Sequence, residues 1–185
     1  MRSILLVAAL LVIAGCDRQV SSNGQVAANA AAGDTAAKPP ASKLDRSHAG
    51  QPAPDVGFVN GDGEDASLAG FSGKPLLMNL WATWCAPCIK ELPTLDKLAA
   101  TPGAPQVLAL SQDMQPQSTV AAFLDEKKIG LDSYQDKEMA MSSALGVQTL
   151  PTTVLYSSEG KEIWRYTGEM DWTSPQARQL LAEAK

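Results

Sequence analysis

The feature that most constrains this 185-residue chain is a pair of cysteines, Cys85 and Cys88, set between an apolar strand and a helix. Residues 75–81 form a nearly continuous apolar run, which is typical of a strand covered on both faces. A helix is expected from about residue 86 to 100, because leucines recur there at helical spacing. The two cysteines would then lie one helical turn apart, within reach of a disulfide. The spacing therefore predicts a redox-active pair.

The start of this helix would give the two cysteines different roles. Cys85 would meet unsatisfied N–H groups and a partial positive charge, which stabilise a thiolate and lower the pKa of the thiol. We therefore expect Cys85 to attack a substrate disulfide, and Cys88, under the first turn, to resolve the mixed disulfide. Pro87 is compatible with this place, because its missing N–H falls among donors that have no partner within a helix.

Metal binding is an alternative use of two cysteines at this spacing. A structural zinc site would need four ligands, from a second cysteine pair or from histidines. Outside the pair, the sequence offers only Cys16 and His48, in a segment that lacks the pattern of a folded domain. A copper(I) site formed by the two thiolates alone stays open.

The N-terminal residues have the pattern of an export signal. The apolar run at residues 4–13 is too short for an ordinary membrane span and has the length of a signal-peptide core. Residues 13–16, with the sequence Ile-Ala-Gly-Cys, resemble a bacterial lipobox, in which the cysteine is acylated and becomes the first mature residue. We therefore expect a signal peptide over residues 1–15 and a lipid anchor on Cys16.

The segment that follows has the composition of a linker. Residues 16–51 contain no aromatic residue and are rich in Ala, Ser, Asn, Gln and Gly, so we expect a flexible tether before a folded domain at 52–185. The lone His48 in this stretch is expected to be solvated. Asp17 resembles the signal that retains lipoproteins in the inner membrane. These patterns predict a domain anchored at the periplasmic face of the bacterial inner membrane.

The charge of the chain argues against a role in binding nucleic acid. The formal net charge is −5, and the basic residues are scattered among acidic ones. A nucleic-acid-binding protein would gather its basic residues into a patch that contacts phosphates. We expect a monomer that binds no nucleic acid.

The remaining segments predict an α/β domain. Strands and helices alternate from residue 52 onwards, which is typical of a sheet with parallel strands and helices on its faces. Further strands are expected at residues 56–60, 106–111, 152–156 and 162–166, and further helices at 117–127, 137–145 and 174–184. The strands at 152–156 and 162–166 would pair as an antiparallel hairpin.

Four short motifs in this domain are informative together. They are NLWATWCAPC at residues 79–88, KELP at 90–93, LPTT at 150–153, and EGK at 159–161 with TG at 167–168. With them, the chain resembles the TlpA and ResA group of thioredoxin-like, membrane-tethered thiol–disulfide oxidoreductases. The resemblance implies a thioredoxin-like fold with a central mixed sheet flanked by helices. It also implies an N-terminal strand extension and a strand–helix insertion around residues 117–146.

The resemblance also implies a docking place for substrate. Pro151 would be a cis-proline that faces the cysteine pair, and the backbone of Leu150 would pair with an extended segment of the client protein. Trp84 would be an exposed aromatic group beside the sulfurs, and Pro87 would join these substrate-contacting residues. Trp81 is expected in the core.

Glu91 is assigned by the resemblance as an acid that assists proton transfer. It lies three residues beyond Cys88, hence on the same helix face. A helical glutamate is ordinarily solvated, whereas a partly buried one would have a raised pKa and could exchange protons with the cysteine. Asn79 occupies the strand position where cytoplasmic thioredoxin carries a buried acid, so Glu91 is the candidate for that role.

The activity implied by the resemblance is reduction of disulfides in client proteins, of the kind needed in cytochrome c or copper-site maturation. It requires no bound cofactor. Electrons would come from a membrane donor of the DsbD/CcdA type, because the periplasm is kept oxidising. A disulfide oxidase or isomerase stays open, because the Ala86-Pro87 pair does not determine the reduction potential. A copper-binding chaperone and a thiol peroxidase are further alternatives.

Overall fold

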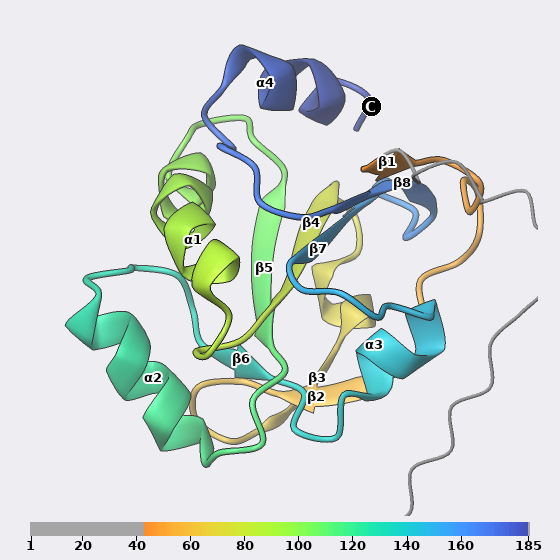
Figure 1. The fold of residues 1–185 in the computed structure, drawn as a ribbon. Helices are drawn as coiled ribbons and strands as arrows, with labels where there is room; N and C mark the ends of the chain where they lie inside the picture. The colour runs from red at the N-terminus through yellow and green to blue at the C-terminus, as the bar shows by residue number, and fades with distance from the viewer. Residues whose placement is uncertain (1–42, 185) are drawn as a thin grey trace, which may run out of the picture. The chain divides into compact units, whose positions relative to one another are not determined.

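The computed structural model of the protein describes residues 43–184, which form a mixed sheet with helices on both faces (Figure 1). The strands are β1 Leu44–Asp45, β2 Gly57–Val59, β3 Asp65–Ser67, β4 Leu76–Trp81, β5 Gln106–Ser111, β6 Tyr134–Gln135, β7 Thr152–Tyr156 and β8 Glu162–Thr167. The helices are η1 Leu68–Phe71, a 3-10 turn, and α1 Ala86–Ala99, α2 Gln117–Glu126, α3 Ala140–Leu145 and α4 Pro175–Leu181. The predicted α/β class is confirmed. None of the helices in this part of the chain is long and apolar enough to cross a membrane.

The sheet has the strand order β1-β8-β7-β4-β5-β6-β2-β3. β4 is its centre, parallel to β5 on one side and antiparallel to β7 on the other. Every residue of β4 is buried, because apolar clusters cover both faces of the sheet. Alternate residues point to opposite faces, so Leu77 and Trp81 join the cluster that contains α1, whereas Met78 and Leu80 join the one that contains α3. α1 therefore begins just after the carboxyl end of a strand that is buried on both faces.

Most predicted elements are confirmed to within a few residues. The helices expected at 86–100 and 117–127 form α1 and α2, and the predicted hairpin is the antiparallel pair β7 and β8. The helix expected from residue 137 begins only at Ala140, because the carboxylate of Asp136 accepts hydrogen bonds from the backbone N–H groups of Ala140 and Met141. The expected insertion contains α2, β6 and α3.

The folded part begins earlier than the expected boundary at residue 52. β1 pairs antiparallel with β8, and the N–H of Gly50 donates to the carbonyl of Glu162 at 2.7 Å. His48 lies in this folded stretch, with its Nε2 3.7 Å from a carboxylate oxygen of Asp45. The partner strand is more than 100 residues away in the sequence, so no local pattern reveals the pairing. The part of the expected linker from residue 43 onwards is therefore folded, whereas the signal peptide, Cys16 and the rest of the linker lie outside the described residues.

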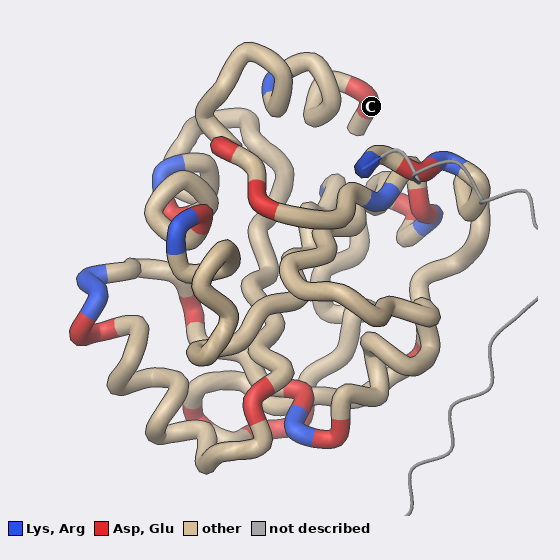
Figure 2. Tube along the Cα trace, viewed as in Figure 1, with Lys and Arg blue, Asp and Glu red and all other residues tan. Residues whose placement is uncertain are grey.

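Charged residues of both signs lie interspersed over the described part of the chain (Figure 2). Two of these charged residues, Arg165 and Glu162, form a buried ion pair. On β8, the guanidinium of Arg165 donates two hydrogen bonds to the carboxylate of Glu162, both at 2.7 Å, and a third to the carbonyl of Leu145. This arrangement ties the end of α3 to the sheet.

Candidate active site

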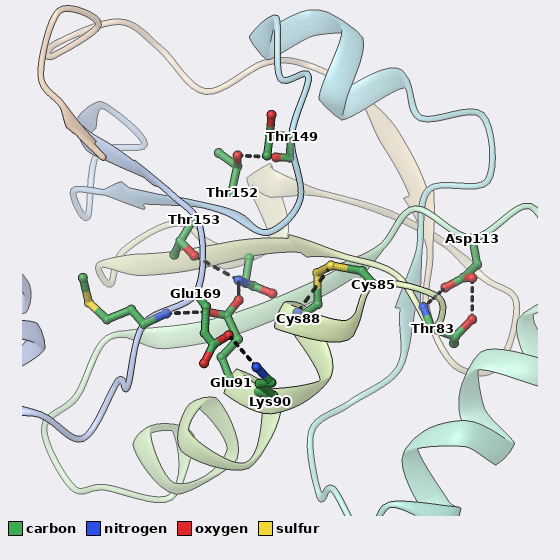
Figure 3. Close-up of a disulfide and its surroundings, with 12 residues drawn as sticks. Thr83, Cys85, Cys88, Lys90, Glu91, Asp113, Thr149, Thr152, Thr153 and Glu169 are labelled. Carbon is green, nitrogen blue, oxygen red and sulfur yellow. Dashed lines mark hydrogen bonds and ion pairs between the residues drawn. A yellow bond between two sulfur atoms is a disulfide. The ribbon is translucent and has the colours of Figure 1, made fainter. Parts of the chain in front are cut away.

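Cys85 and Cys88 form a disulfide at the start of α1 (Figure 3). Their Cα atoms are 5.3 Å apart. Cys85 is the N-cap residue of the helix, and its Sγ accepts a hydrogen bond from the backbone N–H of Cys88 at 3.3 Å. Pro87 lies in the first turn, as expected. The sulfur of Cys85 thus lies at the positive end of the helix, where a thiolate would be stabilised after reduction.

The two cysteines differ in exposure. Cys88 has no exposed surface and Cys85 is 5% exposed. Trp84, directly before Cys85, is 69% exposed, whereas Trp81 is fully buried in the cluster that contains both cysteines. The expected exposure of Trp84 and burial of Trp81 are therefore confirmed. Trp84 directly precedes Cys85, the less completely buried of the two cysteines.

The loop between β4 and α1 is fixed by Asp113, a residue that sequence reasoning missed. Thr83 donates to the buried carboxylate of Asp113 from its backbone N–H at 2.9 Å and from its hydroxyl at 2.7 Å (Figure 3). The hydroxyl of Ser111 donates to it as well, at 2.7 Å. The available signal was an aspartate that follows a buried strand parallel to β4, because the carboxyl ends of such strands meet at one edge of the sheet. Asp113 holds in place the loop that leads to Cys85.

Pro151 follows a cis peptide bond with Leu150, as the resemblance implied. It directly precedes β7, whose first residue Thr152 pairs with Leu80 near the end of β4. Leu150 packs against the apolar cluster that contains both cysteines. The cis-proline loop and the cysteine loop therefore emerge from neighbouring strands at the same end of the sheet.

Glu91 is buried, with 1% of its surface exposed, so it does not lie on a solvated helix face. Its carboxylate, labelled in Figure 3, accepts hydrogen bonds from the Asn79 side-chain amide at 2.7 Å and from the backbone N–H of Met170 at 3.1 Å. It also accepts one from the indole N–H of Trp172 at 3.2 Å. Burial raises the pKa of Glu91 to about 7, and Glu169 nearby adds to the rise, although the three donors favour the charged form. This carboxyl group can accept or release a proton near neutral pH.

The partners of Glu91 come from three distant parts of the chain. Asn79 lies on β4, and its amide also donates to the hydroxyl of Thr153 on β7 at 2.9 Å. Met170 and Trp172 lie in the segment after β8, about 80 residues from Glu91. Sequence reasoning identified Asn79 only as a replacement for an acid. The sequence carried no signal that Met170 and Trp172 would contact Glu91.

Metal binding has no further support from side-chain clustering. Among residues 43–184, no three side chains of His, Cys, Asp or Glu gather closely enough to hold a metal ion.

The part of the chain that carries this site is similar to known proteins. The redoxin family model matches residues 48–181. The chain belongs to the redoxin family. Among its relatives, ResA, a thiol-disulfide oxidoreductase of Halalkalibacterium halodurans, is 32% identical over 119 residues, covering 62% of this chain and 67% of the relative. ResA of Bacillus cereus is 30% identical over 130 residues, covering 69% and 75%.

This redoxin has the same fold as a protein of known structure. The exposed lipoprotein thioredoxin Etrx1 of Streptococcus pneumoniae superposes with a TM-score of 0.61 at 24% identity, covering 70% of this chain and 99% of that one. The predicted thioredoxin-like fold is therefore confirmed. The ResA relatives identify this redoxin as a thiol–disulfide oxidoreductase of the ResA type, and its Cys85–Cys88 disulfide is present in the structure.

Proposed function

We propose that this redoxin is a membrane-tethered, extracytoplasmic reductase of disulfides in client proteins. One observation carries the thiol–disulfide exchange in this proposal. The buried cysteine of the pair, Cys88, lies one turn from Glu91, a buried acid whose pKa of about 7 suits proton transfer. The more accessible sulfur belongs to Cys85, at the helix start. This asymmetry supports a sequence in which Cys85 meets the client and Cys88 completes the exchange.

The reaction starts from the reduced dithiol. The thiolate of Cys85 attacks one sulfur of the client disulfide, so that a mixed disulfide forms and the other client sulfur leaves as a thiolate. Cys88 then loses its proton to the carboxylate of Glu91 and attacks the Sγ of Cys85. The Cys85–Cys88 disulfide forms, the second client sulfur leaves as a thiolate that takes up a proton, and the client has gained two electrons.

The client docks at the end of the sheet where the two loops meet. Leu150 and the cis-proline Pro151 offer backbone to an extended client segment, which binds by strand addition. Trp84 and Pro87 lie on either side of Cys85 in the sequence and contact the residues next to the client disulfide. The exposure of Trp84 supports this role, because a large apolar side chain at the surface is available for a partner.

The membrane tether rests on the sequence pattern of the N-terminus. Acylation of Cys16 after removal of residues 1–15 would hold the domain at the periplasmic face of the inner membrane. A membrane donor of the DsbD/CcdA type would return electrons to the Cys85–Cys88 disulfide, since an oxidising compartment cannot. Cytochrome c or copper-site maturation is the client pathway that this arrangement fits.

Two measurements test the direction of electron flow and the clients. Equilibration with glutathione should give a reduction potential clearly below about −180 mV, whereas a value near about −120 mV, typical of strong oxidants, would overturn the reductase assignment. In the native periplasm, a Cys88→Ser variant should retain client proteins on Cys85 as mixed disulfides. A variant that lacks both cysteines is the control and should retain none.

Two outcomes would redirect the proposal. Tight stoichiometric copper binding by the reduced protein, without disulfide exchange, would favour a copper chaperone.

For the tether, a labelled fatty acid should be incorporated by the wild type and not by Cys16→Ser. Equal labelling of the two proteins would remove Cys16 from the anchor.

A further inference from the structure

Asn79 lies on the central strand β4 and contacts α1 through Glu91. It is fully buried on β4, between Leu77 and Trp81, and alternate residues of a strand share one face. Leu77 and Trp81 belong to the apolar cluster that contains Cys85 and Cys88. The amide of Asn79 therefore lies on the face of β4 that this cluster covers.

The two ends of this amide are used differently. Its nitrogen donates both hydrogens, one to Glu91 Oε1 at 2.7 Å and one to the Thr153 hydroxyl at 2.9 Å. Its oxygen, Oδ1, is buried and finds no hydrogen-bond donor within residues 43–184. Buried carbonyl oxygens without a partner are uncommon and costly. The oxidised protein thus holds, within the described residues, a buried acceptor without a donor on the amide that bonds to Glu91.

Reduction of the disulfide supplies a donor in the same place. Cys88 precedes Glu91 by one helical turn, so the two side chains are neighbours on one helix face. Because the nitrogen of Asn79 is held on Glu91 at 2.7 Å, the amide lies close to the helix face that carries both side chains. In the disulfide, the sulfur of Cys88 carries no hydrogen. Reduction turns it into a fully buried thiol, whose S–H is a weak donor that can use an acceptor in this place.

The other charged groups nearby are already engaged. The carboxylate of Glu91 accepts from three donors. Glu169, in the segment packed beside it, lies 3.6 Å from the ammonium group of Lys90 and influences Glu91 by charge alone. On the strand side, Thr153 contributes a hydroxyl that does not titrate in this range. Among these acceptors, the oxygen of Asn79 is the one that has no donor within residues 43–184.

We propose that Asn79 is a positioning residue that responds to the redox state of Cys88. Its Oδ1 accepts the S–H of the reduced thiol, while its nitrogen keeps the carboxylate of Glu91 turned toward the same sulfur. The reduced state is thereby stabilised relative to the disulfide. When Cys88 attacks the mixed disulfide, its proton passes to Glu91, the Cys85–Cys88 bond forms and the client thiolate leaves. Asn79 Oδ1 then loses its donor again.

The test is the equilibrium constant for oxidation of the dithiol by glutathione, measured with the full chain. Asn79→Leu removes the acceptor and should favour the disulfide, raising this constant about three- to tenfold, which is the usual worth of one hydrogen bond. Trp172→Phe is the comparison variant. Each substitution removes one donor from Glu91, so both should move the pH profile of Cys88 in the same direction. Only Asn79→Leu removes the acceptor, so the constant of Trp172→Phe should stay within about twofold of the wild type.

An unchanged constant in Asn79→Leu, or an equal rise in Trp172→Phe, would overturn the proposal. If Asn79→Leu does not fold, the infrared spectrum of a variant with Cys16→Ser and Cys85→Ser decides, because Cys88 is then the one thiol in the chain. The S–H stretch of Cys88 should lie below the frequency of a free thiol, and a band at the free-thiol frequency would refute the hydrogen bond. The inference rests on the Cys85–Cys88 exchange of the proposed function, not on its direction. The equilibrium constant of the wild type tests the direction of electron flow. The ratio of the Asn79→Leu constant to the wild-type constant tests the hydrogen bond of Asn79.

Discussion

Replacing Glu91 with glutamine should make the stability of the oxidised protein less dependent on pH. In the folded protein, burial raises the pKa of Glu91 from its ordinary value of 4.5 to about 7. Between these values the folded state binds more protons than the unfolded state, so the free energy of unfolding must fall as pH rises. At about 1.4 kcal/mol for each pH unit, the interval from 4.5 to 7 corresponds to about 3 kcal/mol. This stability is fully present below pH 4.5 and is lost by pH 7.

The assay is denaturant unfolding of the oxidised wild type and of Glu91→Gln between pH 4.5 and 8. Subtracting the two free energies removes the titrations that both proteins share. The wild type should lose about 3 kcal/mol relative to Glu91→Gln across this range, with the steepest change between pH 5 and 7. A flat difference would show that Glu91 titrates as an exposed acid. A difference of the opposite sign would mean that the three donors to the carboxylate outweigh its burial.

Three other substitutions test the site and its support. In a purified system, Cys88→Ser should accumulate a mixed disulfide on Cys85 with a protein substrate, detected by mass spectrometry, and rapid release of that substrate would exclude Cys88 as the resolving thiol. Trp84→Ala should change the free energy of unfolding by less than about 0.5 kcal/mol, because the side chain is 69% exposed. It should nevertheless raise the KM for a protein disulfide and not for a small one, and equal effects on both would argue against docking. Arg165→Met should cost about 3 to 5 kcal/mol, because it leaves the buried carboxylate of Glu162 unpaired, and a loss below 1 kcal/mol in denaturant unfolding would contradict this reasoning.

The sequence predicts the cysteine pair and its surroundings well because the signals are local. A continuous apolar run, two cysteines one turn apart and a leucine pattern place β4 and α1 without reference to the rest of the chain. These features depend on residues within about 15 positions of Cys85. The exposure of Trp84 was instead implied by the resemblance to the TlpA and ResA group, and the burial of Trp81 by the tendency of large aromatic side chains to be buried.

Features that depend on distant residues could not be predicted in the same way. β1 has only two residues and forms because β8 offers it an edge. Asp113 can be identified as a clamp only after β5 is known to lie beside β4. Glu91 is buried because Trp172 and Met170 cover it from the far end of the chain. In each case a contact between residues far apart in the sequence, and not the local residue pattern, determines the structure.

The surroundings of Glu91 indicate why an acid lies at this position at all. If its only role were packing, an apolar side chain of similar size would avoid the loss of stability that burial of the charge imposes above pH 5. Three donors from separate elements instead converge on the carboxylate, and Asn79 links it to β7, next to the cis-proline. Donors that stabilise the charged form of a buried carboxylate at this cost in stability indicate that ionisation of Glu91 serves the reaction. Glu91→Gln should therefore be the more stable protein at pH 8 and the slower one in disulfide exchange, and a variant that is both more stable and equally fast would remove the reason for the acid.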